Sequence, residues 1–369
     1  MIYFDSAATS FQKPPAVRGA VERAMRTCAS VGRGGHQPAI NAAQTVFDCR
    51  ELAAELFDCE AEQVAFTMNA THGLNIAIRT LVPEGGRVVL SGFEHNAVTR
   101  PLHALHAEQK IAGRVLFSPQ DTLESFENAL KSSPCAAICN YVSNVFGYVL
   151  PIQGIAALCR LYEVPLIIDA SQAAGTLPVS LRHTGARFIA MPGHKGLYGP
   201  QGTGLLLCSE GAEPLLFGGT GSVSIGQDMP EFLPDRLEAG THNVPGIAGL
   251  AAGLQYVRMR TPEKIWQKER TLAELLRKQL PCLPRIRPFF GQAQGGVVSF
   301  VIDGMDCEEA AQKLSQQAVA VRAGVHCAPL AHQSAGTLDS GTVRVSFSDF
   351  NTPQEVTAFL RICKKLFSS

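Results

Sequence analysis

The chain has 369 residues, of which 46% are hydrophobic and 17% charged, so it is long enough to bury a large core. Lys and Arg together number 32, as do Asp and Glu, and this balance gives no net field that would attract nucleic acid or an anionic membrane. No apolar stretch reaches the roughly 18–20 residues that span a bilayer. The first residues, MIYFDSAATSFQKPP, lack the basic and apolar regions of a signal peptide. We therefore expect a cytoplasmic protein with neither a nucleic-acid nor a membrane partner.

Short apolar runs alternate with longer amphipathic segments over the first two-thirds of the chain. Strands are predicted at 63–67, 87–91, 114–118, 136–142, 165–170, 187–191 and 202–208. Helices are predicted between several of them, including 41–58, 71–82, 95–109, 121–131 and 151–163. Apolar strands joined by helices are typical of a mostly parallel sheet that is covered on both faces. The pattern therefore predicts an α/β fold.

The last third has a different pattern. In chain order it predicts a charged helix at 261–280, a strand at 295–303, a helix at 306–316, strands at 318–322 and 342–348, and a helix at 352–367. This order indicates a smaller α+β domain. We expect a large domain over 16–255 and a small domain made of 1–15 and 256–369.

Polar residues follow five of the predicted strands. Ligands of open α/β sheets bind beyond the carboxyl ends of the strands, so these residues are candidates for a common pocket. One polar residue at a strand end is routine, whereas five from different strands indicate a constructed site. The residues concerned are Asn69 with Ala70 and Thr71, His95, Asn144, Asp169, and His194 with Lys195.

The turn TMNATHGLN at 67–75 opens a predicted helix, and the free N–H groups there would bind an anion. It lacks the GxxxxGK[ST] pattern of a P-loop, and an ordinary helix cap would look the same. Asp169 ends an apolar strand, where an unpaired carboxylate is costly. A cationic partner such as a protonated pyridine nitrogen would stabilise it, although a cap on the next segment explains the residue equally well.

Lys195 lies between His194 and Gly196 in the turn MPGHKGLYG. It could be a solvated loop lysine or an amine that takes part in chemistry. An anion site, a carboxylate for a ring nitrogen and a lysine together match pyridoxal phosphate held as a Schiff base. The amine pKa of about 10.4 would then have to fall, and burial or neighbouring positive charge would lower it.

The eleven cysteines are scattered through the chain without a CxxC pair or a His-rich cluster. We expect no metal site. In a reducing compartment most of these thiols would pack as small hydrophobic side chains.

Five stretches together make the sequence recognisable: YFDSAATSFQKP, GHKGLYGPQGTG, RLEAGT, VRAGVHCAP and RVSFSDFNT. In this order and spacing the chain resembles the cysteine desulfurase and selenocysteine lyase family, in the class V aminotransferase branch of the fold-type I pyridoxal phosphate enzymes. The resemblance implies a large domain with a mostly parallel mixed sheet flanked by helices, a small α+β domain, and pyridoxal 5'-phosphate as cofactor.

The resemblance also implies roles around the cofactor. Lys195 would form the Schiff base and later carry protons, and Asp169 would face the pyridine nitrogen. His95 would stack on the ring and, as a catalytic residue, exchange protons with the substrate. Gln172 would bond the phenolic oxygen. The phosphate would be held by Ala70, Thr71 and His194 and, from the neighbouring subunit of a homodimer, by Gly240 and Thr241.

For the substrate, the resemblance implies that Asn144 and Arg344 bind the carboxylate of L-cysteine or L-selenocysteine. Without it, Arg344 would be interpreted as a strand-edge arginine facing water. Cys327, in RAGVHCA, would accept the sulfur as a persulfide, leaving L-alanine, and pass it to an acceptor protein. A neighbouring His326 or His95 would favour the thiolate.

The sequence departs from the family pattern at several positions. Pro192 stands where a serine is common, His72 replaces a frequent Thr or Glu, and the loop at 31–37 carries an extra glycine. Three alternatives to a cysteine desulfurase remain open. They are a selenocysteine lyase or selenium-handling enzyme, a class V aminotransferase or C–S lyase without persulfide chemistry, and a non-catalytic α/β protein that binds an anion or a partner.

Overall fold

The computed structural model describes residues 1–32, 34–113, 119–223 and 225–367. The larger of its sheets has seven strands in the order β2-β8-β7-β6-β5-β3-β4. All neighbours are parallel except β8, which runs antiparallel to β2 and β7. The strands are β2 (Val64–Thr67), β8 (Gly204–Cys208), β7 (Phe188–Pro192), β6 (Leu166–Asp169), β5 (Ala136–Asn140), β3 (Arg87–Ser91) and β4 (Glu108–Ala112). The predicted mostly parallel α/β sheet is confirmed.

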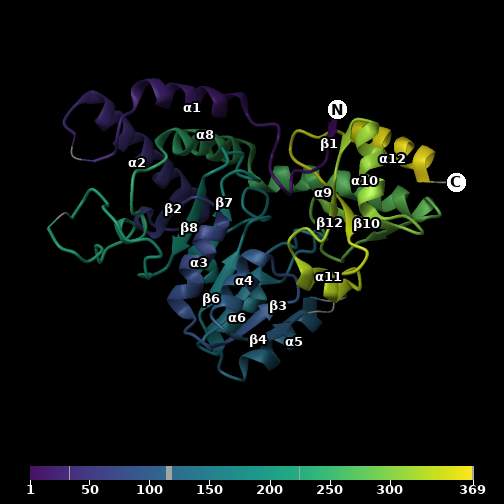
Figure 1. Cartoon of the computed structure of the whole chain (residues 1–369), viewed down its shortest axis with the longest axis horizontal. Coiled ribbons are helices and arrows are strands. Elements are labelled where there is room, and N and C mark those ends of the chain that lie inside the picture. Colours follow the sequence, from purple (N-terminus) through teal and green to yellow (C-terminus); the bar gives the residue numbers. More distant parts are fainter. Residues whose placement is uncertain (33, 114–118, 224, 368–369) are drawn as a thin grey trace.

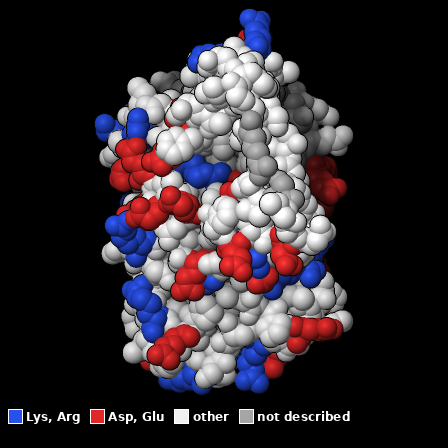
Figure 2. Space-filling view, turned by 90° about the vertical axis from the view of Figure 1, so that its left-hand side faces the viewer, with Lys and Arg blue, Asp and Glu red and all other residues white. Residues whose placement is uncertain are grey.

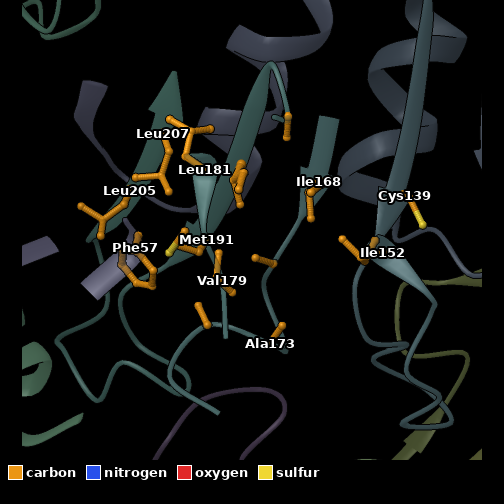
Figure 3. Close-up of a cluster of buried hydrophobic side chains, with 14 of the residues drawn as sticks. Phe57, Cys139, Ile152, Ile168, Ala173, Val179, Leu181, Met191, Leu205 and Leu207 are labelled. Atoms are coloured by element: carbon orange, nitrogen blue, oxygen red, sulfur yellow. The ribbon is translucent and has the colours of Figure 1, made fainter. Parts of the chain in front are cut away.

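Helices cover both faces of this sheet (Figure 1). On one face, α3 (Ala70–Leu81) and α4 (Asn96–Ala104) pack on alternate strand residues such as Leu90 and Ile167. On the other, α2 (Gln37–Phe57), α5 (Pro119–Leu130) and α6 (Ile152–Leu161) contact the residues between them, including Ile168. Figure 3 shows part of this second cluster, with Phe57, Ile152 and Leu205 around the strands. Burial on both sides explains why the strand sequences are apolar throughout.

Four antiparallel strands form a second sheet in the order β12-β13-β10-β9. They are β9 (Ile286–Phe289), β10 (Val297–Ile302), β12 (Arg322–Gly324) and β13 (Thr342–Ser346). Three helices share its hydrophobic core: α9 (Pro262–Gln279), α10 (Cys307–Gln316) and α12 (Pro353–Phe367). The first strand of the chain, β1 (Ile2–Tyr3), pairs with β11 (Val319–Ala320), so the N-terminus lies beside these late elements (Figure 1). The division into two domains remains a prediction.

The remaining helices complete the structure. α1 (Pro15–Thr27) packs on α8 (Val244–Arg260), and α7 (Leu181–Thr184) and α11 (Pro329–Ala335) are short. No helix within the described residues is both long and apolar enough to cross a membrane.

One segment differs from the sequence prediction. The helix expected at 95–109 ends at Ala104, and residues 108–112 form β4 at the edge of the sheet. An edge strand buries little of its surface, so EQKIA carries polar side chains that hide its strand character. His106, with φ of 50°, makes the turn between the two elements. The strand predicted at 114–118 lies outside the described residues.

Candidate active site

The carboxyl ends of β5, β6 and β7 and the first turns of α3 and α4 surround a cavity of about 240 Å³. Nine residues predicted from the sequence line it together: Asn69, Ala70, Thr71, His95, Asn144, Asp169, Gln172, His194 and Lys195. The strand-end argument therefore located one real cavity. Sequence reasoning missed other residues that line the same cavity: Ala8, Ala97, Asn140 and Ser171.

Lys195 is placed by a tight loop that follows β7. A side chain at Gly193 would put its Cβ 2.2 Å from Thr203 Oγ1, and one at Gly196 would put it 2.4 Å from the carbonyl oxygen of Ala174. Such approaches exclude any larger residue, so the glycines around Lys195 let the loop pack against its neighbours. The lysine is thereby held on packed backbone instead of on a free surface loop.

The electrostatic surroundings of Lys195 make its amine more reactive. Burial lowers its pKa from 10.5 to about 8, Asp169 opposes this change, and Arg344 adds to it. A larger fraction of the amine is therefore neutral near pH 7 than in a solvated lysine. This agrees with the expected decrease and favours chemistry over the loop-lysine interpretation.

His95 caps α4, and its Nδ1 accepts a hydrogen bond from the backbone N–H of Ala97 at 3.0 Å. Burial, together with the charge of Lys195, lowers the pKa of His95 to about 4. The ring is therefore neutral at pH 7 and carries its proton on Nε2. A neutral ring at this position suits stacking on an aromatic cofactor.

Asp169 is the last residue of β6 and is buried. Its Oδ1 accepts a hydrogen bond from the backbone N–H of Ser171 at 2.9 Å, which is the capping contact that one interpretation of the sequence predicted. The same residue also lines the cavity, so capping and contact with a ligand are compatible.

Residues 7–10 run along one side of the cavity and hold several of its side chains. Gln172 Nε2 donates to the carbonyl oxygen of Ala7 at 2.9 Å. Thr9 Oγ1 lies 3.0 Å from His194 Nδ1, and Ser10 donates from its backbone N–H to the carbonyl oxygen of His194 at 3.0 Å. The stretch YFDSAATSF contributes to the family resemblance, but its sequence alone did not indicate that residues 7–10 contact Gln172 and His194.

Arg344 lies in β13 and is 2% exposed, so its interpretation as a water-facing strand-edge residue is wrong. Its Nη1 donates to the carbonyl oxygen of Asn144 at 3.0 Å. Arg344 Nε and Asn144 Oδ1 are both buried and have no hydrogen-bond partner among the described residues. Each buried polar atom that lacks a partner is costly, and two of them on residues that contact each other indicate a ligand that pairs with them.

Cys327 belongs to a strained turn that is hydrogen-bonded to the first residue of α4. Both His326 and Cys327 adopt left-handed backbone conformations, with φ of 48° and 55°. Asn144 Nδ2 donates to the carbonyl oxygen of His326 at 2.8 Å, and the N–H of Asn96 donates to that of Cys327 at 2.7 Å. These bonds tie the turn to two elements of the cavity and stabilise a conformation that costs about 1–3 kcal/mol per residue.

Exposure separates Cys327 from most of the other cysteines. It is one of two exposed thiols, with Cys282, whereas six of the eleven are buried. Burial raises the pKa of the Cys139 and Cys363 thiols and makes them poor nucleophiles. Cys327 does not itself line the cavity, but it is an accessible thiol in a turn that is hydrogen-bonded to Asn144 and to Asn96, the residue after His95.

The expectation that a histidine favours the thiolate of Cys327 is wrong. His326 is buried with its Nε2 3.0 Å from Thr342 Oγ1, and burial lowers its pKa to about 2. His95 is neutral for the same reason. The cations near Cys327 are Arg322 and Arg344: the pKa of Arg322 is raised chiefly by its hydrogen bond to Asp5 and also by Cys327, and Cys327 likewise opposes the effect of burial on Arg344.

Gly240 and Thr241 do not line the cavity of Lys195. They line a separate cavity of about 210 Å³ with Met68 and His72. Two residues before Gly240, Glu238 forms an ion pair with Arg50 at 2.9 Å, and this contact holds the start of the segment that carries Gly240 and Thr241. Within one chain the structure thus separates these two residues from the rest of the predicted site.

The residues of the cavity fit pyridoxal phosphate. The first turn of α3, capped by Asn69 through a 2.9 Å bond from the N–H of His72, offers N–H groups to a phosphate. Asp169 suits a cationic ring nitrogen, and Lys195 has the lowered pKa that an aldehyde cofactor requires. Pro192 lines the cavity without a hydroxyl, so the phosphate has one side-chain donor fewer. No group of three or more potential metal ligands occurs among the described residues.

Comparisons with known proteins agree with this site. The family model of aminotransferase class-V matches residues 2–359, and the chain belongs to that family. It is 30% identical to a probable cysteine desulfurase of Pyrococcus abyssi, with 100% of this chain and 95% of the relative covered. A probable cysteine desulfurase of Haemophilus influenzae is 32% identical, with 99% and 85% covered.

Solved structures show the same relationship. The apo structure of a cysteine desulfurase from Thermococcus onnurineus has a TM-score of 0.91 at 29% identity and covers 99% of this chain and 94% of its own. A cysteine desulfurase from Escherichia coli has a TM-score of 0.85 at 25% identity, with 98% and 94% covered. The protein therefore has the fold of the fold-type I pyridoxal phosphate enzymes.

Proposed function

We propose that the protein is a pyridoxal phosphate-dependent L-cysteine desulfurase that forms L-alanine and a persulfide on Cys327. The observation that carries the proposal is a pair of hydrogen bonds. They attach the turn with the exposed Cys327 thiol to the elements around the cavity of Lys195, whose pKa is lowered. The backbone of Cys327 accepts a bond from Asn96, the residue after His95, and the backbone of His326 accepts one from Asn144. The names of the relatives support the same activity.

In this proposal the cofactor is held by the residues that line the cavity. Lys195 would bind its aldehyde carbon, Asp169 its ring nitrogen, Gln172 its phenolic oxygen, and Ala70, Thr71 and His194 its phosphate. His95 would stack on the ring. Bound pyridoxal phosphate supplies an electron sink that stabilises negative charge at the α-carbon of the substrate.

The side chains of the chain then perform the remaining steps. Arg344 Nε, which has no partner among the described residues, would bind the carboxylate of L-cysteine, as predicted. Asn144 was predicted to bind the same carboxylate, but its unpaired Oδ1 is an acceptor and suits the amine end of the substrate. Lys195 Nζ removes the α-proton and returns protons to carbon. The Cys327 thiolate attacks the substrate sulfur, so that an S–S bond forms as the carbon–sulfur bond breaks. The bonding electrons remain on carbon, which is protonated to give alanine.

We also propose a homodimer in which Gly240 and Thr241 reach the phosphate of the partner subunit. Large exposed apolar side chains occur on α2 and on the segment at 209–234, which lie on the same side of the molecule (Figure 1): Ile40, Phe47, Leu216, Phe217, Ile225 and Phe232. Figure 2 shows this side, with a broad uncharged band beside scattered charges of both signs. Such a surface favours association with a second copy. Eleven free thiols fit a reducing, cytoplasmic location.

The test is to incubate purified protein with L-cysteine and, separately, with L-selenocysteine. We expect alanine from L-cysteine and one added sulfur on Cys327, read by mass spectrometry. Cys327→Ala should lose turnover of cysteine and keep that of selenocysteine, while Cys282→Ala, which removes the other exposed thiol, should behave as wild type.

Two outcomes identify the alternatives. If Cys327→Ala releases sulfur from cysteine as fast as wild type, the protein is a C–S lyase without persulfide chemistry. Turnover of selenocysteine alone would instead identify a selenocysteine lyase. Absence of a cofactor absorbance band in the wild type would contradict an enzyme of this class altogether.

A further inference from the structure

Asp5 forms ion pairs with two arginines, one of which, Arg344, is hydrogen-bonded to Asn144 of the cavity. Arg344 Nη2 donates to Asp5 Oδ1 at 2.9 Å, and Arg322 Nη2 donates to Asp5 Oδ2 at 2.9 Å. Arg322 Nε also lies 3.2 Å from Oδ1 and 3.1 Å from Oδ2. One carboxylate is thus shared between a buried guanidinium and one whose side chain is half exposed.

The N-terminal segment does not need these ion pairs to stay in place. The N–H of Phe4 donates to the carbonyl oxygen of Ala320 at 2.9 Å, and the N–H of Ser346 donates to that of Phe4 at 2.8 Å. The N–H of Ala7 donates to Ser346 Oγ at 2.8 Å. Backbone bonds therefore fix the residues on both sides of Asp5, and its carboxylate is available for another task.

The charges of the cluster are unequal. Two guanidinium groups carry two positive charges and Asp5 carries one negative charge, so one positive charge is left over. Arg344, which is 2% exposed, also keeps a buried Nε without a partner among the described residues. A buried charge requires a counter-ion, and a single additional carboxylate would neutralise the cluster. An α-carboxylate provides that charge, and its two oxygens suit a guanidinium.

We propose that Asp5 is a positioning residue for the carboxylate of the substrate. It fixes the guanidinium of Arg344 at the cavity, and Arg322 takes enough of the charge of Asp5 to leave Arg344 able to bind a second carboxylate. The inference rests on the proposed function, because it assigns an amino acid as the ligand of Arg344. It extends that function to a residue 339 positions away in the sequence.

The experiment compares L-cysteine with L-cysteinamide, which lacks the carboxylate, on the cofactor-loaded protein. Asp5→Asn should raise KM for L-cysteine at least about tenfold and leave kcat within about threefold. KM for L-cysteinamide should stay within about twofold of wild type. A purely structural role would change both substrates equally, and that result overturns the proposal.

Arg322→Gln is the second variant, since its side chain is half exposed and its replacement leaves no buried charge without a partner. Without Arg322 the whole charge of Asp5 acts on Arg344, so the substrate carboxylate must compete with it. We again expect a higher KM for L-cysteine and an unchanged KM for L-cysteinamide. An unchanged KM in this variant overturns the proposal even where Asp5→Asn does not fold.

Asp349→Asn is the matched control. Asp349 is also a buried carboxylate shared by two cations, with Arg260 at 2.8 Å and Lys268 at 3.6 Å, but among the described residues neither cation bonds to a residue that lines the cavity, as Arg344 does. It should lower the melting temperature and leave both KM values within about twofold. Calorimetric binding of L-alanine and L-alaninamide gives a readout without turnover. If the wild type forms no alanine from L-cysteine, the proposed function fails, whereas equal loss of both ligands in Asp5→Asn refutes only the role of Asp5.

Discussion

Lys195 and Cys327 are the two reactive groups of the proposed site, and the structure controls them differently. Lys195 lies at the end of a buried strand, in a loop whose glycines pack against backbone, and burial lowers its pKa to about 8. Cys327 is exposed on a left-handed turn that two hydrogen bonds attach to the cavity. Burial thus sets the ionisation of the Lys195 amine, whereas the backbone of the turn sets the location of the Cys327 thiol.

The difference between Lys195 and Cys327 follows from the molecules that each would contact in the proposed function. An amine that binds a resident cofactor profits from a dry site, because removal of water destabilises its charged form. A thiol that passes sulfur to another protein must remain accessible and must still contact the substrate. The comparison predicts that changes around Lys195 alter ionisation and changes around Cys327 alter geometry.

The largest expected effect is that of Lys195→Ala. Without the amine, the cofactor has no covalent partner and the α-proton has no base, so turnover of cysteine should fall by at least about 10³-fold. The absorbance band of the bound cofactor should shift or disappear. Lys364→Ala, at an exposed position on α12, is the control and should retain both.

The second effect tests ionisation in the cofactor-free protein. The pKa of Lys195 is about 8 in the folded state and 10.5 for an unperturbed lysine amine, so between these values the unfolded chain binds more protons and stability rises with pH. The difference corresponds to roughly 3 kcal/mol before partial exposure is discounted. Lys195→Met should therefore stabilise the protein most below pH 8 and least above pH 10.5, measured by urea unfolding. An equal gain at both pH values would contradict the tuning of the amine by burial.

The third effect tests geometry. Asn144→Ala removes the side-chain donor to the carbonyl oxygen of His326, a loss of about 1 kcal/mol, and leaves in place the backbone carbonyl of residue 144 that accepts from Arg344. We expect kcat/KM for L-cysteine to fall about tenfold or more and the persulfide on Cys327 to form more slowly in rapid-quench measurements. The ionisation of Lys195 should be unchanged; a shifted pH dependence would show that the two regions are not independent.

The smallest effect concerns His326. Asn tolerates the left-handed conformation and retains a neutral donor for Thr342 Oγ1, so His326→Asn should change activity by less than about threefold. The rate of Cys327 alkylation at pH 7 should stay within about twofold of wild type, because the cations near the thiol are Arg322 and Arg344. A much slower alkylation in this variant would restore the histidine as partner of the thiol.

The sequence predicted the large sheet and much of the cavity, because strand ends and glycine turns are encoded locally. Asp169, Lys195 and His95 each follow an apolar run, and parallel strands bring such residues to one edge. The edge strand β4 was missed because its polar exposed side resembles a helix surface.

Other features could not be read locally. Asp5 and Arg322 were missed because nothing in their own neighbourhoods shows that they meet, and the ionisation of His326 depends on burial by distant elements. The Lys195 loop and the cavity-facing side of residues 7–10 likewise depend on contacts between segments that are far apart in the chain.

The pairing of β1 with β11 and of Asp5 with Arg344 has a consequence for biosynthesis. Residues 2–5 are synthesised before partners that lie more than 300 positions later, so this edge of the pocket closes only after Arg344 has been made. Until then the strands of the large sheet can pair, but the nascent chain lacks the arginine that would recognise an amino acid. Capture of substrate is thereby postponed until the late strands have been synthesised.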